Sequence, residues 1–247
     1  MDGLPEGITT CLFDLDGVLT KTAKIHAQAW KAMFDDFLRD WAQRRGEPFE
    51  EFDRPTDYDE YVDGKPRLDG VYSFLQSRGI DLPMGSPTDP PQAETVHALG
   101  TRKNDLVLEL ISQQGVEPYE GSVRFAEAVR DRGLRRAVVS SSTNCRDVLA
   151  AAGIDHLFEE VMDGTVAERE QLAGNPAPDT FLAAARMVGA TPPQAAVFED
   201  AQAGVEAGRA GSFGLVVGVD RTGQADALRR RGADVVVQDL AELLERA

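Results

Sequence analysis

The sequence predicts an α/β fold in which a Rossmann-like, doubly wound parallel sheet forms the core and an α-helical cap domain is inserted. Short apolar runs rich in Val, Leu and Ile recur along the chain, and each is followed by a helical stretch, which is the pattern of a parallel sheet wrapped by helices. A long helical segment separates the first run from the second and predicts the insertion. The core is expected over residues 1–22 and 115–247, and the cap over residues 23–114.

Five apolar runs are the expected strands of the core. They cover residues 8–13, 134–140, 195–198, 215–219 and 233–237. In open parallel sheets, ligands bind beyond the carboxyl ends of the strands. The residues that follow these runs are therefore the first candidates for a functional site.

The insert reads as packed helices joined by loops. Leu106, Leu110 and Ile111 lie on one side of an expected helix over residues 93–114, and segment 82–91 is a surface loop on its Pro and Gly content. Segment 47–66 is expected to be mainly loop with a short helix. The first insert helix has an apolar stripe at helical spacing, which we interpret as core: Ile25, Ala29, Trp30, Met33, Phe34, Phe37 and Trp41. A helical excursion of this kind is typical of a lid.

Composition limits the class of function. The formal net charge of −16 argues against attraction to nucleic acid or to an anionic membrane. No secretory signal is expected at the N-terminus, and no apolar run approaches the roughly 20 residues that span a bilayer. Cys11 and Cys145 are expected to be buried or inert free thiols in a reducing compartment. These features predict a cytoplasmic protein, and we expect a monomer.

Two acids one residue apart follow the first strand. Side chains alternate along a strand, so Asp14 and Asp16 emerge on the same side unless the chain has begun to turn, and Gly17 lets the backbone leave tightly. Paired carboxylates suit a hard cation such as Mg²⁺, and one of them could act as nucleophile while the other moves protons. The alternative is a solvated acidic turn, because short strings of this kind are common.

Two other strands end in polar residues. The second expected strand ends at Ser140, and the third is followed by Glu199 and Asp200. If the strands are parallel, these groups face the same crevice as Asp14 and Asp16. The serine has an alternative structural interpretation, because Ser141 or Ser142 could cap the helix that follows.

These residues give the chain a family resemblance. Residues 14–19 (DLDGVL), Ser140, residues 175–179 (NPAPD) and residues 198–200 (FED) occur in the order of the four motifs of haloacid dehalogenase-like phosphotransferases. Within that superfamily the chain is most similar to the β-phosphoglucomutase family. Further matches are Thr22, His26, Trp30, residues 102–105 (RKND) and residues 199–204 (EDAQAG).

The resemblance implies a two-step phosphoryl transfer. Asp14 would form an aspartyl phosphate, and Asp16 would serve as general acid and then as general base. The cofactor would be Mg²⁺, bound by Asp14, the backbone carbonyl of Asp16 and Asp200 with support from Glu199. Ser140 and nearby backbone amides would hydrogen-bond the phosphoryl oxygens. The substrate would be a small sugar phosphate.

The resemblance also implies cap residues that recognise the substrate. Arg67 would hold the non-reacting phosphate through its planar fork, and Lys103 would approach Asp16 and the substrate. His26 and Thr22, four residues apart and expected on one helical face, would link cap closure to the general acid. Alternatively, the cations are solvated surface groups and the histidine is structural. The remaining implied substrate-binding residues are Trp30, Ser141, Ser142 and Asn144.

One position departs from the family pattern. The third motif normally presents a lysine before Pro-x-Pro-Asp, and this chain has Asn175. We keep Asn175 among the expected catalytic residues, because an amide still donates a hydrogen bond although it carries no charge. Arg169 or Lys21 could compensate for the missing charge, although neither occupies the matching position.

The expected reaction is the interconversion of β-glucose 1-phosphate and glucose 6-phosphate through a bisphosphate intermediate. Two alternatives remain open at this point. One is a magnesium-dependent phosphatase acting on sugar phosphates or other small phosphomonoesters. The other is a phosphosugar-binding protein, or a weakened enzyme, in which Asn175 has removed an essential charge.

Overall fold

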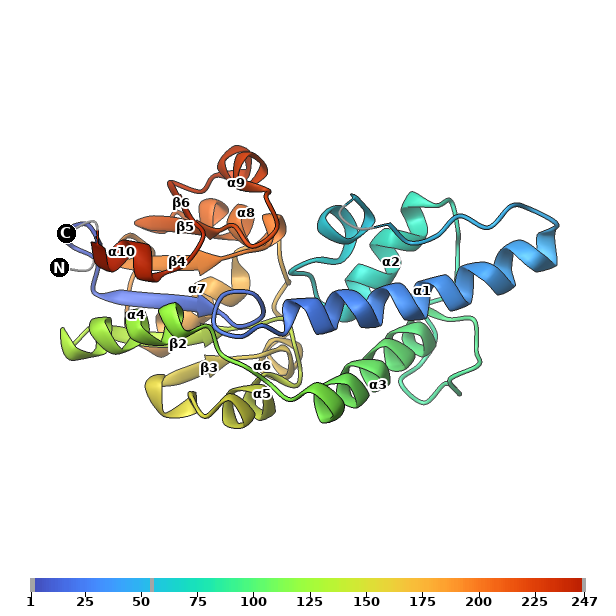
Figure 1. Cartoon of the computed structure of the whole chain (residues 1–247), viewed down its shortest axis with the longest axis horizontal. Coiled ribbons are helices and arrows are strands. Elements are labelled where there is room, and N and C mark those ends of the chain that lie inside the picture. The colour runs from blue at the N-terminus through green and yellow to red at the C-terminus, as the bar shows by residue number, and fades with distance from the viewer. Residues whose placement is uncertain (1–2, 54–55, 246–247) are drawn as a thin grey trace. The chain divides into compact units, whose positions relative to one another are not determined.

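The predicted parallel sheet is confirmed in a computed structural model, which describes residues 3–53 and 56–245. Six parallel strands are ordered β3-β2-β1-β4-β5-β6 (Figure 1). The strands are β1 (Thr10–Asp14), β2 (Arg135–Val139), β3 (Glu160–Met162), β4 (Ala195–Glu199), β5 (Leu215–Val219) and β6 (Val235–Val237). The chain moves outward from β1 in both directions, which creates a switch point between β1 and β4 where ligands bind in such sheets.

Strand β3 was not among the expected strands. It has three residues, begins with Glu160 and has no apolar run of its own. Its backbone pairs with β2 through Ala137–Glu160, Val138–Val161 and Val139–Met162. Pairing with a buried neighbour therefore determines this strand, and a single-sequence pattern does not detect it.

The chain divides into two compact units. The first comprises residues 1–22, 64–66 and 116–247, and the second comprises residues 23–63 and 67–115. Residues 64–66 lie within the helical insert in sequence but cluster with the α/β unit.

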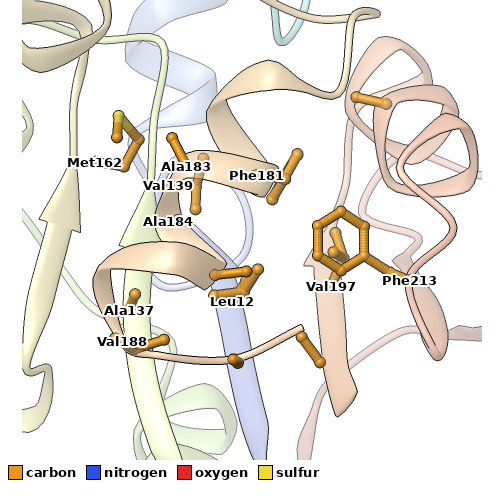
Figure 2. Close-up of a cluster of buried hydrophobic side chains, with 14 of the residues drawn as sticks. Leu12, Ala137, Val139, Met162, Phe181, Ala183, Ala184, Val188, Val197 and Phe213 are labelled. Carbon is orange, nitrogen blue, oxygen red and sulfur yellow. The ribbon is translucent and has the colours of Figure 1, made fainter. Parts of the chain in front are cut away.

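One face of the sheet packs against α7 (Asp179–Met187). Figure 2 shows Leu12 of β1, Val139 of β2 and Val197 of β4 close to Phe181 of α7. Alternation along each strand places every second residue on this face, and all four of these side chains are buried. The other helices of this unit are α4 (Glu120–Asp131), α5 (Cys145–Ala152), α6 (Gly164–Arg169), α8 (Gln202–Ala210), α9 (Ala225–Arg231) and α10 (Ala241–Glu245).

Intervening strand positions point to the opposite face and form an aromatic cluster. The rings of Phe13 on β1 and Phe198 on β4 stack with centroids 4.7 Å apart. Phe125 of α4 packs edge-on against both rings, and Phe158 packs against Phe13. These contacts anchor β1 and β4 beside each other, so the strand ends that carry the acids are held in register.

The helical unit has a separate core. It contains α1 (Ala23–Arg45), α2 (Arg67–Ser77), α3 (Val96–Gln114) and a short π-helix (Tyr58–Val62). The expected stripe on α1 is confirmed as core, with Trp41 only partly buried. Phe34 lies at its centre and contacts the rings of Trp30, Phe52 and Phe74.

Both cysteines are free and buried, as the sequence predicts. Burial raises the pKa of the Cys11 thiol and of the Cys145 thiol, and the carboxylates of Asp16 and Asp14 raise the pKa of Cys145 further. Both side chains therefore stay protonated, small and apolar. No helix in the described part of the chain combines the length and apolarity needed to cross a membrane.

Candidate functional site

A tight turn follows Asp14 at the end of β1. The amides of Leu19 and Thr20 both donate to the carbonyl of Leu15, at 3.0 and 2.9 Å, and the Gly17 amide donates to the Thr20 carbonyl at 2.8 Å. Gly17 has a φ of 91°, which favours glycine, and a Cβ there would lie 1.8 Å from Asp200 Oδ2. Glycine therefore allows the turn to pack directly against the end of β4.

The Asp16 carboxylate is held by a threonine. The hydroxyl of Thr22 donates to Asp16 Oδ1, and the Thr22 and Thr20 hydroxyl oxygens are 2.6 Å apart. Helix α1 begins at Ala23, so Thr22 precedes the helix. The expectation that Thr22 and His26 share a helical face is therefore wrong, because the contact with Asp16 keeps Thr22 in the α/β unit.

Three carboxylates converge where β1 and β4 end. Asp14, Glu199 and Asp200 each offer an oxygen, and these oxygens lie within 4.8 Å of one another. Glu199 and Asp200 are only 1% and 6% exposed, and Glu199 Oε2 accepts a hydrogen bond from the Ala201 amide at 2.8 Å. Like charges this close and this buried are unfavourable unless a cation or protons neutralise them. The oxygen-only donor set fits Mg²⁺.

Ser140 follows β2 and is buried. Its Oγ accepts from the Ser142 amide at 3.1 Å, and its own amide donates to the Met162 carbonyl at 2.9 Å. The N-cap residue of α5 is Asn144, so the alternative that Ser141 or Ser142 caps this helix is wrong. Ser142 Oγ instead accepts from the Asn144 amide, which makes the segment a chain of serine-stabilised turns.

Asn175 lies beside the acidic group. Its Nδ2 donates to the Gly64 carbonyl at 3.0 Å and lies 3.5 Å from Glu199 Oε1. Ser141 Oγ donates to the same Gly64 carbonyl at 2.9 Å. Asn175 Oδ1 is buried and has no hydrogen-bond partner among the described residues. The amide thus presents its donor toward the carboxylates, where a lysine would present an ammonium group.

The two other cations considered as compensation bind elsewhere. Lys21 Nζ is 2.8 Å from Glu117, and Arg169 is 3.1 Å from Glu170. All four side chains are substantially exposed. The structure therefore gives neither cation a contact with Asn175 or the carboxylates.

Expected substrate-binding residues also cluster within the helical unit. Lys103 is 5% exposed, its Nζ is 3.0 Å from His26 Nδ1, and it lies 4.8 Å from the centre of the Trp30 ring. The alternative that Lys103 is a solvated surface lysine is wrong. Arg67 of α2 donates to Asn104 Oδ1 at 2.7 Å.

Two residues beside the site, Gln224 and Arg221, are not among those expected from the sequence. Gln224 Nε2 donates to the Asp200 carbonyl at 3.1 Å, and Arg221 Nε donates to the Gly17 carbonyl at 2.8 Å. Both lie in the loop after β5. The only available signal was their position after a core strand, and this does not reveal which carbonyl a side chain reaches.

A model of the haloacid dehalogenase-like hydrolase family matches residues 8–211. This chain belongs to that family.

Relatives of this haloacid dehalogenase-like protein include β-phosphoglucomutases. One from Mycobacterium bovis is 58% identical, with 98% of this chain and 94% of the relative covered. One from Bacillus subtilis is 32% identical, with 94% and 90% covered. The crystal structure of the Clostridium difficile β-phosphoglucomutase matches with a TM-score of 0.72 at 25% identity, covering 96% of this chain and 93% of the other.

A glycine of α8 makes room for one of the three carboxylates that converge where β1 and β4 end. A Cβ at Gly204 would lie 1.7 Å from Glu199 Oε1. We therefore expect Gly204→Ala to displace Glu199 and weaken Mg²⁺ binding by about 10-fold, measured by isothermal titration calorimetry. Gly208→Ala on the same helix is the control, because the three atoms nearest to its Cβ would be methyl carbons of Val197 and Val216, at 3.3 Å, and not carboxylate oxygens. Equal Mg²⁺ affinities for the two variants would contradict this role of Gly204.

Proposed function

We propose that this protein is a magnesium-dependent β-phosphoglucomutase that interconverts β-glucose 1-phosphate and glucose 6-phosphate. The observation that carries the proposal is that Asp14, at the end of β1, and Asp16, just after it, have different surroundings. The carboxylate of Asp14 lies in a cluster with those of Glu199 and Asp200, whereas the carboxylate of Asp16 accepts a hydrogen bond from Thr22. Asp14 is thereby suited to nucleophilic attack beside a cation, and Asp16 to proton transfer. The 58% identity to the Mycobacterium bovis enzyme supports this assignment.

The proposed reaction has two half-reactions on Asp14. A carboxylate oxygen of Asp14 bonds to phosphorus while the bond from phosphorus to the donor oxygen breaks, and Asp16 protonates that leaving oxygen. In the second half, the acceptor hydroxyl gives its proton to Asp16 as its oxygen bonds to phosphorus and the Asp14 oxygen leaves. A bisphosphate that rebinds in the other orientation connects the two sugar monophosphates.

Charge and hydrogen bonding around Asp14 would support the transfer. Asp14, Asp200 and the backbone carbonyl of Asp16 would hold Mg²⁺ with support from Glu199, and the ion would lessen repulsion between the carboxylate and the phosphoryl group. The hydroxyl of Ser140 would donate a hydrogen bond to a phosphoryl oxygen, because its Oγ already accepts one from the Ser142 amide. Asn175 would add an uncharged donor.

Residues of the helical unit would bind the rest of the sugar phosphate. Arg67 would hold the non-reacting phosphate with its planar fork. Lys103 would serve the substrate and the proton-transfer step, and its buried ammonium, which rests on Trp30 and contacts His26, supports a role beyond that of a surface lysine. We assign the remaining substrate contacts to Thr22, Ser141, Ser142 and Asn144.

A coupled assay separates the mutase from a phosphatase. With β-glucose 1-phosphate, Mg²⁺ and a trace of β-glucose 1,6-bisphosphate, we expect glucose 6-phosphate to accumulate while free phosphate stays a minor product. α-Glucose 1-phosphate is the control and is expected to give little turnover. Stoichiometric release of phosphate would overturn the mutase assignment in favour of a phosphatase. Sugar-phosphate binding without any turnover would identify a binding protein.

A further inference from the structure

Hydrogen bonds to one carboxylate hold the loop after β5 together, and its side chains reach the backbone at both strand ends of the site. Asp220 Oδ1 accepts hydrogen bonds from the amides of Thr222, Gly223 and Gln224, at 3.2, 2.7 and 2.8 Å. The Asp220 amide donates to the Val237 carbonyl of β6 at 2.7 Å. One carboxylate thus determines the path of the loop, and the side chains that it carries leave from defined positions.

Arg221 extends from this loop to the turn after Asp16. Its Nε donates to the Gly17 carbonyl at 2.8 Å, and its Nη1 donates to the Gln238 carbonyl at 2.6 Å. The guanidinium carbon lies 3.6 Å from the centre of the Tyr119 ring, and the side chain is 14% exposed. Stacking and hydrogen bonds in two directions fix the planar group, so its contact with Gly17 is preorganised.

Gln224 makes the matching contact at the other strand end. Its Nε2 donates to the Asp200 carbonyl at 3.1 Å, and its Oε1 accepts from Gln202 at 3.0 Å. The loop therefore donates one hydrogen bond to the backbone next to Asp16 and one to the backbone of Asp200. These strand ends carry the acids of the proposed metal site.

We propose that Arg221 is a positioning residue that fixes the orientation of the Asp16–Gly17 turn toward the metal and the transferred phosphoryl group. Gly17 is held on both sides, because its amide donates to Thr20 and its carbonyl accepts from Arg221. Glycine has broad conformational freedom, so loss of the second bond releases the turn that joins Asp14, Asp16 and Gly17. This inference rests on the proposed function and adds a residue outside the four family motifs.

Substitution of Arg221 by Met tests this role. Methionine keeps an apolar chain against Tyr119 but removes every donor to Gly17. We expect the Mg²⁺ dissociation constant, measured by titration calorimetry without substrate, to rise about 10-fold. The rate of Asp14 phosphorylation should fall about 10-fold or more at saturating Mg²⁺, while KM for the sugar phosphate stays within about twofold. Arg221→Lys should restore part of both losses, because an ammonium still donates to a carbonyl.

Arg229→Ala is the matched control. Arg229 is an exposed arginine of α9 that pairs with Asp226 at 3.0 Å, so its loss removes the same charge without touching a strand end. Unchanged Mg²⁺ affinity and phosphorylation rate in Arg221→Met would overturn the proposal, as would equal losses in Arg229→Ala. If Arg221→Met does not fold, Arg221→Lys and Arg221→Gln decide by the same two measurements. Wild-type protein that binds Mg²⁺ but does not convert β-glucose 1-phosphate would reject the proposed function alone.

Discussion

Replacement of Asp14 by Asn is expected to abolish the phosphoenzyme and lower turnover by about 10⁴-fold or more. A neutral carboxamide is a far weaker nucleophile than a carboxylate, and the substitution also removes one of the three charges that converge where β1 and β4 end. Fold stability should change little or rise, because the mutation relieves repulsion among buried acids. Activity and stability therefore move independently in this variant.

The phosphoenzyme can be trapped directly. Rapid quenching after mixing with labelled β-glucose 1,6-bisphosphate should leave a label that is acid-stable and released by hydroxylamine, as an acyl phosphate is. Asp16→Asn should still accept the label, but slowly, because it keeps the nucleophile and loses the proton donor. Asp36→Asn, an exposed acid of α1, is the control and should label like the wild type. A hydroxylamine-sensitive label on Asp14→Asn protein would show that another group accepts the phosphoryl.

The sheet was predictable because its strands are buried on both faces. Continuous apolar runs such as Leu215–Val219 occur for that reason, and a punctuated series of such runs indicates a parallel sheet. Strand β3 was not predicted, because its pairing with β2, and not its own composition, makes it a strand. The sequence therefore predicts a strand well where its residues are extensively buried. At short edge strands, pairing with a neighbouring strand decides the structure, and the local sequence does not show it.

The candidate site was predictable only where residues follow strands. Asp14, Ser140, Glu199 and Asp200 could be grouped because parallel strands end at one edge of the sheet. Contacts made by side chains of distant loops were not predictable. The bond from Asn175 to Gly64 joins residues 111 positions apart, and the bond from Arg221 to Gly17 joins residues 204 positions apart. The periodicity of apolar residues within a helix or strand carries no information about contacts between residues so far apart in the sequence.

The distribution of charge raises a specific difficulty for an anionic substrate. The chain has a formal net charge of −16, and four carboxylates lie on or directly after β1 and β4. Asn175 occupies the place of a family lysine, and both Lys21 and Arg169 are paired with exposed glutamates. We therefore expect the proposed reaction to depend strongly on Mg²⁺ and on hydrogen-bond donors, which would offset repulsion of the phosphoryl group.

Asn175→Lys is accordingly expected to raise the rate of Asp14 phosphorylation by about 10-fold. Asn175 Nδ2 already lies 3.5 Å from Glu199 Oε1, so an ammonium at this position enters the field of a buried carboxylate. A charge-assisted hydrogen bond contributes about 1.5–3 kcal/mol, whereas loss of the neutral bond to the Gly64 carbonyl costs about 1 kcal/mol. The balance favours lysine in the transition state, where negative charge is greatest.

Asn175→Met separates the effect of charge from that of side-chain length. Methionine is close to lysine in length and has neither charge nor donor, so its phosphorylation rate should fall below that of the wild type. Rapid-quench measurement of all three proteins at saturating Mg²⁺ gives the comparison. An unchanged or lower rate in Asn175→Lys would mean that this site no longer depends on a cation at the third motif. The hydrogen bond to Gly64 would then be the feature for which asparagine is retained, because it ties residues 64–66 to the strand ends that carry the chemistry.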